Sequence, residues 1–267
     1  MIPSVLPTYN RAPLNFVSGS GTWLVEADGR RFLDLGAGIA VNVLGHAHPA
    51  ITAALREAAG DGTSFGAPTP REMKLAEAIR ERVPSCERVR LMNSGTEATS
   101  TAVRLARGAT GRKRIITFYG NFHGATDALL AAGGSGVATL GIPGTAGVPD
   151  EAVANTLVVP YNVVPEIGND VAAVIVEPVA ANMGVVAPAK GFLEGLRAEC
   201  DRVGALLVFD EVMRRHNIDA RWRERLMELV FYTLKSPLKL TQVNVRNTER
   251  SSEQVKLPAL SRLPHLI

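Results

Sequence analysis

The sequence predicts an α/β fold in which helices cover both faces of a mostly parallel sheet. Short, continuously apolar runs rich in β-branched residues recur along residues 1–213, and such runs are typical of strands buried on both faces. Helix-like stretches separate these runs, and an alternation of strands and helices favours parallel pairing. The length of 267 residues and the hydrophobic content of 46% fit one large or two smaller globular domains.

The first expected elements are a hairpin and two helices. Residues 23–35 place an Asp-Gly turn between two apolar-rich arms, which predicts a β-hairpin. Residues 49–60 begin with proline and continue with apolar residues at helical spacing. Residues 70–83 repeat this pattern until Pro84 ends it. In the second helix we expect five apolar side chains to face inward: Met73, Leu75, Ala76, Ile79 and Val83.

Strands and helices alternate in the sequence that follows. We expect strands at residues 88–92, 114–119, 156–160, 171–177 and 205–209. A helix is expected from Ser94 to about Arg107. Another is expected over residues 191–203, with an inward face made of Phe192, Leu193, Leu196, Cys200 and Val203. Because ligands bind outside the carboxyl ends of parallel strands, candidate site residues should directly follow these strands.

The first such candidate is an anion site after the strand at residues 88–92. Ser94, Gly95 and Thr96 open a helix, and its exposed N–H groups together with two hydroxyls would suit a phosphate. The alternative is an ordinary capping box, formed by Ser94 with Glu97 three residues later. The sequence by itself leaves both interpretations open.

The other three strand ends carry an aromatic ring, an imidazole, an amide and carboxylates. Phe122 and His123 could form a stacking platform for a flat ligand, or Phe122 could simply pack in a loop. Glu177 and Asn182 could hold a ligand or satisfy loop backbone groups. Asp210 ends a buried strand, where a carboxylate is costly unless a protonated ring nitrogen or nearby N–H groups compensate it. Together with a phosphate cradle, these groups describe a site for pyridoxal phosphate.

Longer stretches resemble a known enzyme family. Residues 62–213 are similar to glutamate-1-semialdehyde 2,1-aminomutases of the class III pyridoxal-phosphate aminotransferase family, in "VRLMNSGTEATSTAVRLARGATGR", "VIVEPVAANMGVVAPAKGFLEGLR" and "GALLVFDEVM". Residues 5–50 and "ITFYGNFHGAT" resemble acetylornithine aminotransferases instead. The resemblance implies a truncated large domain of the fold-type-I pyridoxal-phosphate transferase class, and a homodimer. It also implies an aminomutase that makes 5-aminolevulinate from glutamate 1-semialdehyde, with an ornithine-type aminotransferase as the alternative.

The resemblance also implies how the phosphate and the ring faces of the cofactor would be held. Gly95 and Thr96, with Ser94 beside them, would bind the phosphate. Phe122 would stack on one face of the ring and Val212 would pack on the opposite face. These roles come from the matching motifs and are expectations for this chain.

The edges of the ring have implied partners as well. His123 would lie beside the ring, Asn182 near its phenolic oxygen, and Asp210 would pair with its pyridine nitrogen. The family also requires a Schiff-base lysine, and no lysine of this chain stands in a matching context. Lys235, in "YTLKSP", is the weakly matching candidate, so a non-catalytic, truncated domain is a third interpretation of the chain.

The composition changes after Met213. Residues 214–267 carry 11 Lys and Arg against 5 Asp and Glu, and none of the 25 glycines. We therefore divide the chain into an N-terminal segment at residues 1–60, a pyridoxal-phosphate-binding portion at 61–213 and a divergent basic tail at 214–267. Within the tail, residues 219–234 have a helical pattern.

Several classes of protein are excluded by what the sequence lacks. It has no apolar run of about 18 residues and no signal-peptide pattern, so we expect a cytoplasmic protein without a membrane partner. Cys86 and Cys200 form no motif and fit free thiols. His46 and His48 have no further ligating residues near them, so we expect no metal. The expected partner is a small amino-acid-derived substrate, and no nucleic acid.

Overall fold

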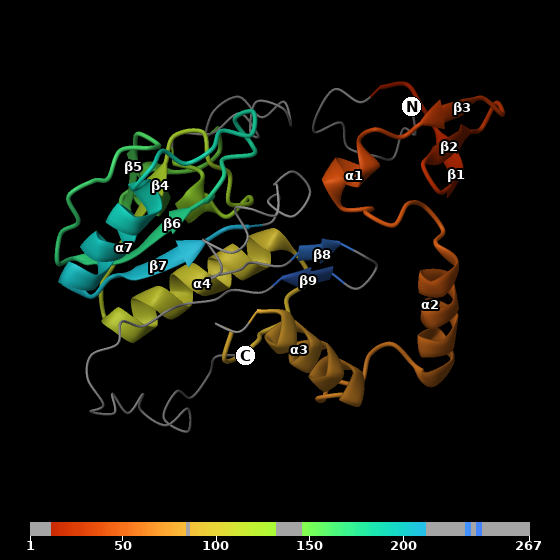
Figure 1. Ribbon diagram of the computed structural model, residues 1–267, viewed down its shortest axis with the longest axis horizontal. Coiled ribbons are helices and arrows are strands. Elements are labelled where there is room, and N and C mark those ends of the chain that lie inside the picture. Colours follow the sequence, from red (N-terminus) through yellow and green to blue (C-terminus); the bar gives the residue numbers. More distant parts are fainter. Residues whose placement is uncertain (1–11, 84–85, 132–145, 212–232, 236–238, 242–267) are drawn as a thin grey trace.

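A four-stranded parallel sheet lies towards one end of the computed structural model, which describes residues 12–83, 86–131, 146–211, 233–235 and 239–241 (Figure 1). Its strands are β4 (Arg114–Phe118), β5 (Thr156–Val159), β6 (Val171–Val176) and β7 (Leu206–Phe209). They are ordered β5-β4-β6-β7, and all three neighbouring pairs are parallel. The predicted α/β fold with a parallel sheet is confirmed.

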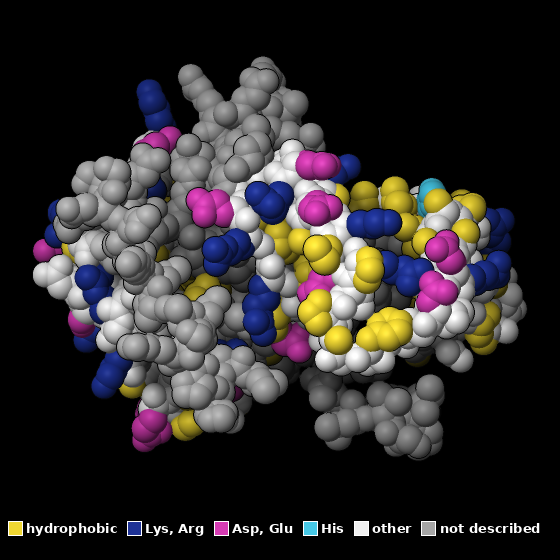
Figure 2. Space-filling model, turned by 90° about the horizontal axis from the view of Figure 1, so that it is seen from below, with side chains coloured by type: hydrophobic (Ala, Val, Ile, Leu, Met, Phe, Trp, Pro, Cys, Tyr) yellow, Lys and Arg dark blue, Asp and Glu magenta, His cyan; other side chains and the backbone are white. Residues whose placement is uncertain are grey.

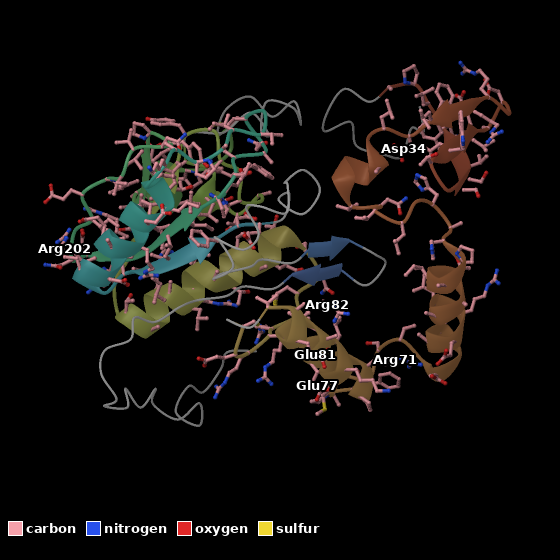
Figure 3. All side chains as sticks on the ribbon, viewed as in Figure 1. Asp34, Arg71, Glu77, Glu81, Arg82 and Arg202 are labelled. Atoms are coloured by element: carbon pink, nitrogen blue, oxygen red, sulfur yellow. The ribbon has the colours of Figure 1, made fainter. Side chains whose placement is uncertain are left out.

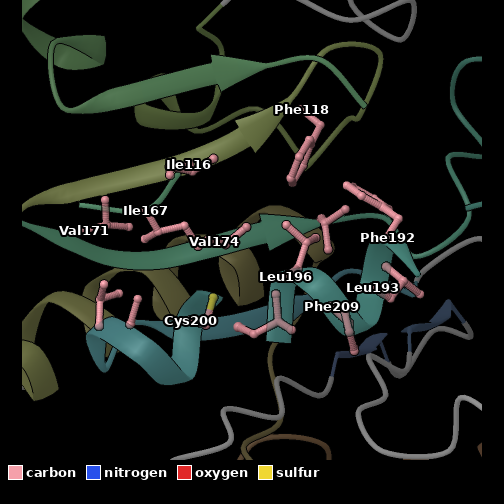
Figure 4. Close-up of a cluster of buried hydrophobic side chains, with 14 residues drawn as sticks. Ile116, Phe118, Ile167, Val171, Val174, Phe192, Leu193, Leu196, Cys200 and Phe209 are labelled. Atoms are coloured by element: carbon pink, nitrogen blue, oxygen red, sulfur yellow. The ribbon is translucent and has the colours of Figure 1, made fainter. Parts of the chain in front are cut away.

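Two helices cover the two faces of this sheet, α4 (Gly95–Thr110) and α7 (Phe192–Val203). Successive strand residues point to opposite faces, so the sheet contributes to two separate cores. One core joins α4 to Ile115, Ala173, Ile175, Leu206 and Val208. The other joins α7 to Ile116, Phe118, Val174, Val176, Leu207 and Phe209 (Figure 4). All five side chains predicted to form the inward face of α7 are buried.

Leu196 of α7 is fully buried in the second core, and it gives a test of that packing. Replacing it by alanine is expected to lower the free energy of unfolding by about 2–5 kcal/mol, because a cavity remains where the side chain was. The control is Leu105→Ala in α4, where the side chain is 54% exposed, with an expected change within about 0.5 kcal/mol. Urea unfolding followed by circular dichroism measures both, and equal losses would contradict this core.

The N-terminal residues form a second, antiparallel sheet, which lies at the opposite end of the molecule in Figure 1. The predicted hairpin is confirmed as β2 (Trp23–Glu26) and β3 (Arg31–Leu33). The sequence did not reveal the third strand, β1 (Phe16–Ser20), which pairs with β2. A short helix, α1 (Ala37–Ala40), follows the sheet.

Two longer helices lead from this sheet towards α4. The predicted helices are present as α2 (Pro49–Asp61) and α3 (Pro70–Arg82). Arg71 connects them, with its guanidinium 2.6 Å from Asp61 and 3.5 Å from Glu57 (Figure 3). The prediction that Met73 faces inward is wrong. Its side chain is 61% exposed, because α3 buries only its C-terminal end, where Ile79 packs.

The strand predicted at residues 88–92 is also wrong. The segment is irregular, although Val89 and Leu91 pack against α3. Apolar β-branched residues form a strand only when a neighbour pairs with them, and within the described ranges no strand pairs with this segment. Four further short elements were not anticipated: η1 (Asp127–Leu129), α6 (Asp150–Val153) and the paired strands β8 (Thr233–Lys235) and β9 (Lys239–Thr241).

The helix predicted at residues 219–234 falls mostly outside the described residues. Its final two residues, Thr233 and Leu234, belong to strand β8, so that part of the prediction is wrong. Over the ranges that the structure describes, no helix is both long enough and apolar enough to cross a membrane.

Candidate functional site

Strand order defines where a ligand would bind. The chain goes from β4 to β5 on one side and from β6 to β7 on the other, and β4 and β6 are neighbours. Where onward connections leave neighbouring parallel strands in opposite directions, a crevice opens at their carboxyl ends. The segments that follow β4, β6 and β7 begin at this edge of the sheet, and each carries predicted site residues.

The N-terminus of α4 supplies the possible anion site. Ser94 caps the helix: its Oγ accepts a hydrogen bond from the Glu97 N–H at 3.2 Å and donates to Glu97 Oε2 at 3.0 Å. The first bond of the helix runs from the Ala98 N–H to Ser94 O. The N–H groups of Gly95 and Thr96 precede that bond and lie at the positive end of the helix dipole. Ser94 thus acts as a cap, and its role as a phosphate ligand stays a prediction.

The loop after β4 packs directly on this helix end. The Ala125 N–H donates to Thr96 Oγ1 at 3.1 Å, and Thr99 Oγ1 donates to His123 O at 2.6 Å. Gly124 lies between these contacts with a φ of +89°, and a Cβ there would be 2.5 Å from Thr96 Oγ1. Only glycine combines that backbone conformation with so close an approach.

His123 and Asp210 form a buried pair, although 87 residues separate them in the sequence. His123 Nδ1 lies 2.9 Å from Asp210 Oδ2, and the residues are 2% and 5% exposed. An ionised carboxylate only accepts hydrogen bonds, so Nδ1 carries the proton in this pair. His123 Nε2 is buried and has no hydrogen-bond partner among the described residues. A buried carboxylate of this kind favours a ligand that brings a positive charge.

Glu177 is a further buried carboxylate at this edge, directly after β6. Its Oε1 accepts a hydrogen bond from the Phe122 N–H at 2.7 Å, and its Oε2 accepts from the N–H groups of Ala181 and Asn182. Burial, together with the negative charge of Asp210, raises the pKa of the Glu177 carboxyl to about 7. The sequence left open whether Glu177 meets a ligand or the backbone, and these contacts are with the backbone.

This raised pKa predicts a pH dependence of stability. The folded chain holds the Glu177 proton more tightly than the unfolded chain does, so its contribution is complete below pH 4.5 and is lost as the pH rises through about 7. Through this group we expect the free energy of unfolding to fall by up to about 3 kcal/mol across that window. Urea unfolding at about pH 5 and about pH 8 measures it. An equal fall in Glu177→Gln would contradict the assignment.

The remaining predicted site residues are placed as follows. Asn182 Nδ2 donates to Gly120 O at 3.0 Å, so its amide joins two loops. Phe122 is half-buried. Val212 lies outside the described residues. The backbone of Lys235 belongs to β8, and its side chain is outside the described part.

Both ring nitrogens of His46 contact neighbouring polar side chains. His46 Nε2 lies 2.7 Å from Asp34 Oδ2, and Nδ1 lies 2.9 Å from the Asn42 amide nitrogen. Among the residues that the structure describes, no three His, Cys, Asp or Glu side chains form a group that could hold a metal ion.

The fold agrees with a comparison against protein families. The model of the aminotransferase class-III family matches residues 6–214. The chain therefore belongs to the class III aminotransferases.

Within that class, the chain is similar to proteins described as glutamate-1-semialdehyde 2,1-aminomutases. The glutamate-1-semialdehyde 2,1-aminomutase of Bordetella avium (strain 197N) is 53% identical over 200 residues, which cover 72% of this chain and 47% of that protein. The enzyme of the same description from Desulforapulum autotrophicum is 53% identical over 209 residues, covering 76% and 49%. The chain thus spans about half the length of the curated relatives it matches.

Solved structures agree at the level of the fold. A glutamate-1-semialdehyde aminomutase variant from Pseudomonas aeruginosa PAO1, in complex with PMP, superimposes with a TM-score of 0.75 at 26% identity and covers 87% of this chain and 53% of that one. A transaminase with PLP bound gives a TM-score of 0.69 at 37% identity, covering 77% and 50%.

Proposed function

We propose that residues 61–213 form the pyridoxal-phosphate-binding portion of a glutamate-1-semialdehyde 2,1-aminomutase. The observation that carries the proposal is the buried His123–Asp210 pair, which lies at the carboxyl ends of parallel strands. Over 200 residues the chain is 53% identical to one such enzyme. The complete reaction would convert glutamate 1-semialdehyde to 5-aminolevulinate.

The residues present fit the phosphate group of this cofactor. The N–H groups of Gly95 and Thr96 at the start of α4 are suited to an anion. Thr96 Oγ1 already accepts from the Ala125 N–H, so its own proton remains to be donated to a phosphate oxygen. Gly124 has no side chain to fill the space beside Thr96.

The residues also fit the ring. The Asp210 carboxylate would hold a proton on the pyridine nitrogen, and the His123 Nδ1–H would orient that carboxylate. Both side chains are nearly inaccessible to water, which strengthens a charge pair at this position. Phe122 would stack on the ring and Asn182 would lie near it. When bound, pyridoxal phosphate supplies an electron sink for bond changes next to an amine.

The proposal is tested with two forms of the cofactor. Pyridoxamine phosphate binds without any lysine, so its binding tests the site itself. Pyridoxal phosphate followed by borohydride reduction and peptide mass spectrometry tests whether a lysine reacts. We expect saturable binding of pyridoxamine phosphate, measured by induced circular dichroism. A folded chain that binds neither form would overturn the proposal.

A non-catalytic, cofactor-binding domain is the second candidate function. It is favoured because Lys74, Lys113 and Lys190, the lysines whose side chains the structure describes, are all exposed. Lys235 remains a candidate for the reacting lysine. Borohydride labelling of Lys235 together with formation of 5-aminolevulinate would favour the aminomutase. Amino transfer from ornithine or acetylornithine to 2-oxoglutarate would favour the ornithine-type alternative.

We also propose a homodimer in the cytoplasm. Large hydrophobic side chains are exposed in the N-terminal segment, in the loop between α2 and α3, and in α3, namely Leu35, Val43, Leu44, Phe65 and Met73. Figure 2 shows hydrophobic side chains exposed between charged ones on the face seen from below. Such exposure supports burial against a second copy. Cys86 and Cys200 are buried and form no disulfide, which suits a reducing compartment. Sedimentation equilibrium measures the association, and a monomer at all concentrations would contradict it.

A further inference from the structure

Glu177 occupies an unusual place for a carboxylate. It directly follows β6, a strand buried along its whole length, and it is itself 4% exposed. Burying a carboxylate is costly, so its hydrogen bonds show what it is used for. Its side chain accepts three hydrogen bonds, and all three donors are backbone N–H groups. They belong to two different loops, the loop after β4 and the loop after β6.

The bonds between these loops run in both directions. The Phe122 N–H donates to Glu177 Oε1 at 2.7 Å, while the Glu177 N–H donates to Asn121 Oδ1 at 2.8 Å. A further bond, from Asn182 Nδ2 to Gly120 O at 3.0 Å, lies beside them. Reciprocal bonds of this kind fix the position of one loop against the other in the same way that a capping box fixes the start of a helix.

We infer that Glu177 is a positioning residue, whose carboxylate holds the backbones of Phe122 and Asn182 in place for a cofactor bound at the ends of β4, β6 and β7. The inference rests on the proposed function and deepens it. The Glu177 carboxylate is engaged by backbone groups and acts through the residues that they carry. Its role is to order the ligand-binding loops before the ligand arrives.

The chemistry of the contacts favours an ionised glutamate, because backbone N–H donors stabilise the carboxylate. Both oxygens accept hydrogen bonds, so a glutamine amide would direct an NH₂ group at one of the donors. Aspartate keeps the charge but is shorter by one C–C bond of about 1.5 Å, too short to reach both loops. Charge-assisted bonds to a carboxylate are also stronger than neutral ones.

Three titratable groups surround this carboxylate, and their ionisation also affects how cofactor affinity depends on pH. His123 and Asp210 act on it from the ends of β4 and β7, and Tyr161, which follows β5, interacts with its charge. A variant that removes only Glu177 leaves these three groups in place. Comparison with wild type therefore isolates the contribution of Glu177 to the profile.

Amide hydrogen exchange on the cofactor-free chain tests the first part of the inference. In Glu177→Gln we expect exchange at the N–H groups of Phe122, Ala181 and Asn182 to be about tenfold faster or more, while the amides of α7 keep their rates. Glu177→Asp should show the same acceleration. The matched control is Glu26→Gln, because Glu26 is also a buried glutamate but pairs with Arg30 in the antiparallel sheet.

Binding of pyridoxamine phosphate tests the second part. We expect both Glu177 variants to raise its dissociation constant about tenfold or more. Glu26→Gln should leave it unchanged. In wild type the affinity should rise with pH as Glu177 ionises, and this step should be missing in Glu177→Gln. Far-UV circular dichroism establishes whether each variant is folded. If Glu177→Gln does not fold, Glu177→Asp takes its place in the binding test.

The outcomes separate this inference from the proposed function. A wild-type chain that does not bind pyridoxamine phosphate overturns the proposed function, while hydrogen exchange still decides whether Glu177 orders the loops. Unchanged exchange in folded variants overturns the inference. Faster exchange with unchanged affinity also overturns it, because Glu177 would then serve the fold alone.

Discussion

Replacing Asp210 by asparagine is expected to weaken the binding of pyridoxamine phosphate by about a hundredfold. The asparagine side chain has nearly the same size, and its oxygen can still accept the hydrogen bond from His123 Nδ1. The change therefore removes the negative charge and keeps the packing. Because Asp210 is only 5% exposed, water cannot replace that charge as the partner of a protonated ring nitrogen.

The comparison variant for this prediction is Asp170→Asn. Asp170 pairs with Arg114 at 2.8 Å on the surface, where both side chains are about half exposed. An exposed pair of this kind contributes little, and we expect a dissociation constant within about twofold of wild type. Equilibrium dialysis measures both constants. Equal affinity in wild type and Asp210→Asn would show that the nitrogen of the ligand does not meet this carboxylate.

The second large effect is expected from Gly124→Ala. The new Cβ would lie 2.5 Å from Thr96 Oγ1 and 2.7 Å from Thr96 Cα, so the loop and the start of α4 must move apart. This movement separates the Ala125 N–H from Thr96 Oγ1 and disturbs the anion site. We expect a loss of about 2–4 kcal/mol in the free energy of unfolding and at least about a tenfold loss of affinity for pyridoxamine phosphate.

Gly29→Ala separates the backbone cost from the clash. Gly29 has a φ of +91°, almost equal to that of Gly124, but a Cβ there would meet no atom within 4 Å. Its cost should be the backbone strain alone, about 1 kcal/mol, with no effect on binding. Thermal unfolding and dialysis measure the two variants side by side. Similar losses of stability and affinity in both variants would show that the close approach of Gly124 to Thr96 contributes nothing to either.

The sequence was sufficient for those parts of the fold that local patterns determine. The strands of the parallel sheet and helix α7 follow from the apolar runs and from helical spacing, because these elements are buried on the faces that the pattern indicates. The segment at residues 88–92 alternates charged and apolar residues, as a strand can, but is irregular. Its conformation depends on whether a neighbouring strand is present, which local sequence cannot show.

The candidate site was predictable in its location and only partly in its contacts. The rule that ligands bind at carboxyl ends of strands indicated Asp210 and His123 separately. Their pairing depends on the strand order β4-β6-β7, which brings together residues far apart in the sequence. From the sequence, Glu177 could bind either a ligand or backbone groups. The contact with the backbone depends on the loop after β4, which lies beside Glu177 in the folded chain. For Ser94 and Asn182, the structure shows the local contacts that were the alternatives.

The most direct test of the account is a titration of the folded, ¹⁵N-labelled chain with pyridoxamine phosphate, followed by amide chemical shifts. The account predicts saturable shifts at Gly95, Thr96, Phe122 and Asp210, which begin the segments that meet at the end of the parallel sheet. Inorganic phosphate should reproduce the shifts at Gly95 and Thr96 alone. Saturable shifts confined to other residues, or none in a folded chain, would contradict it.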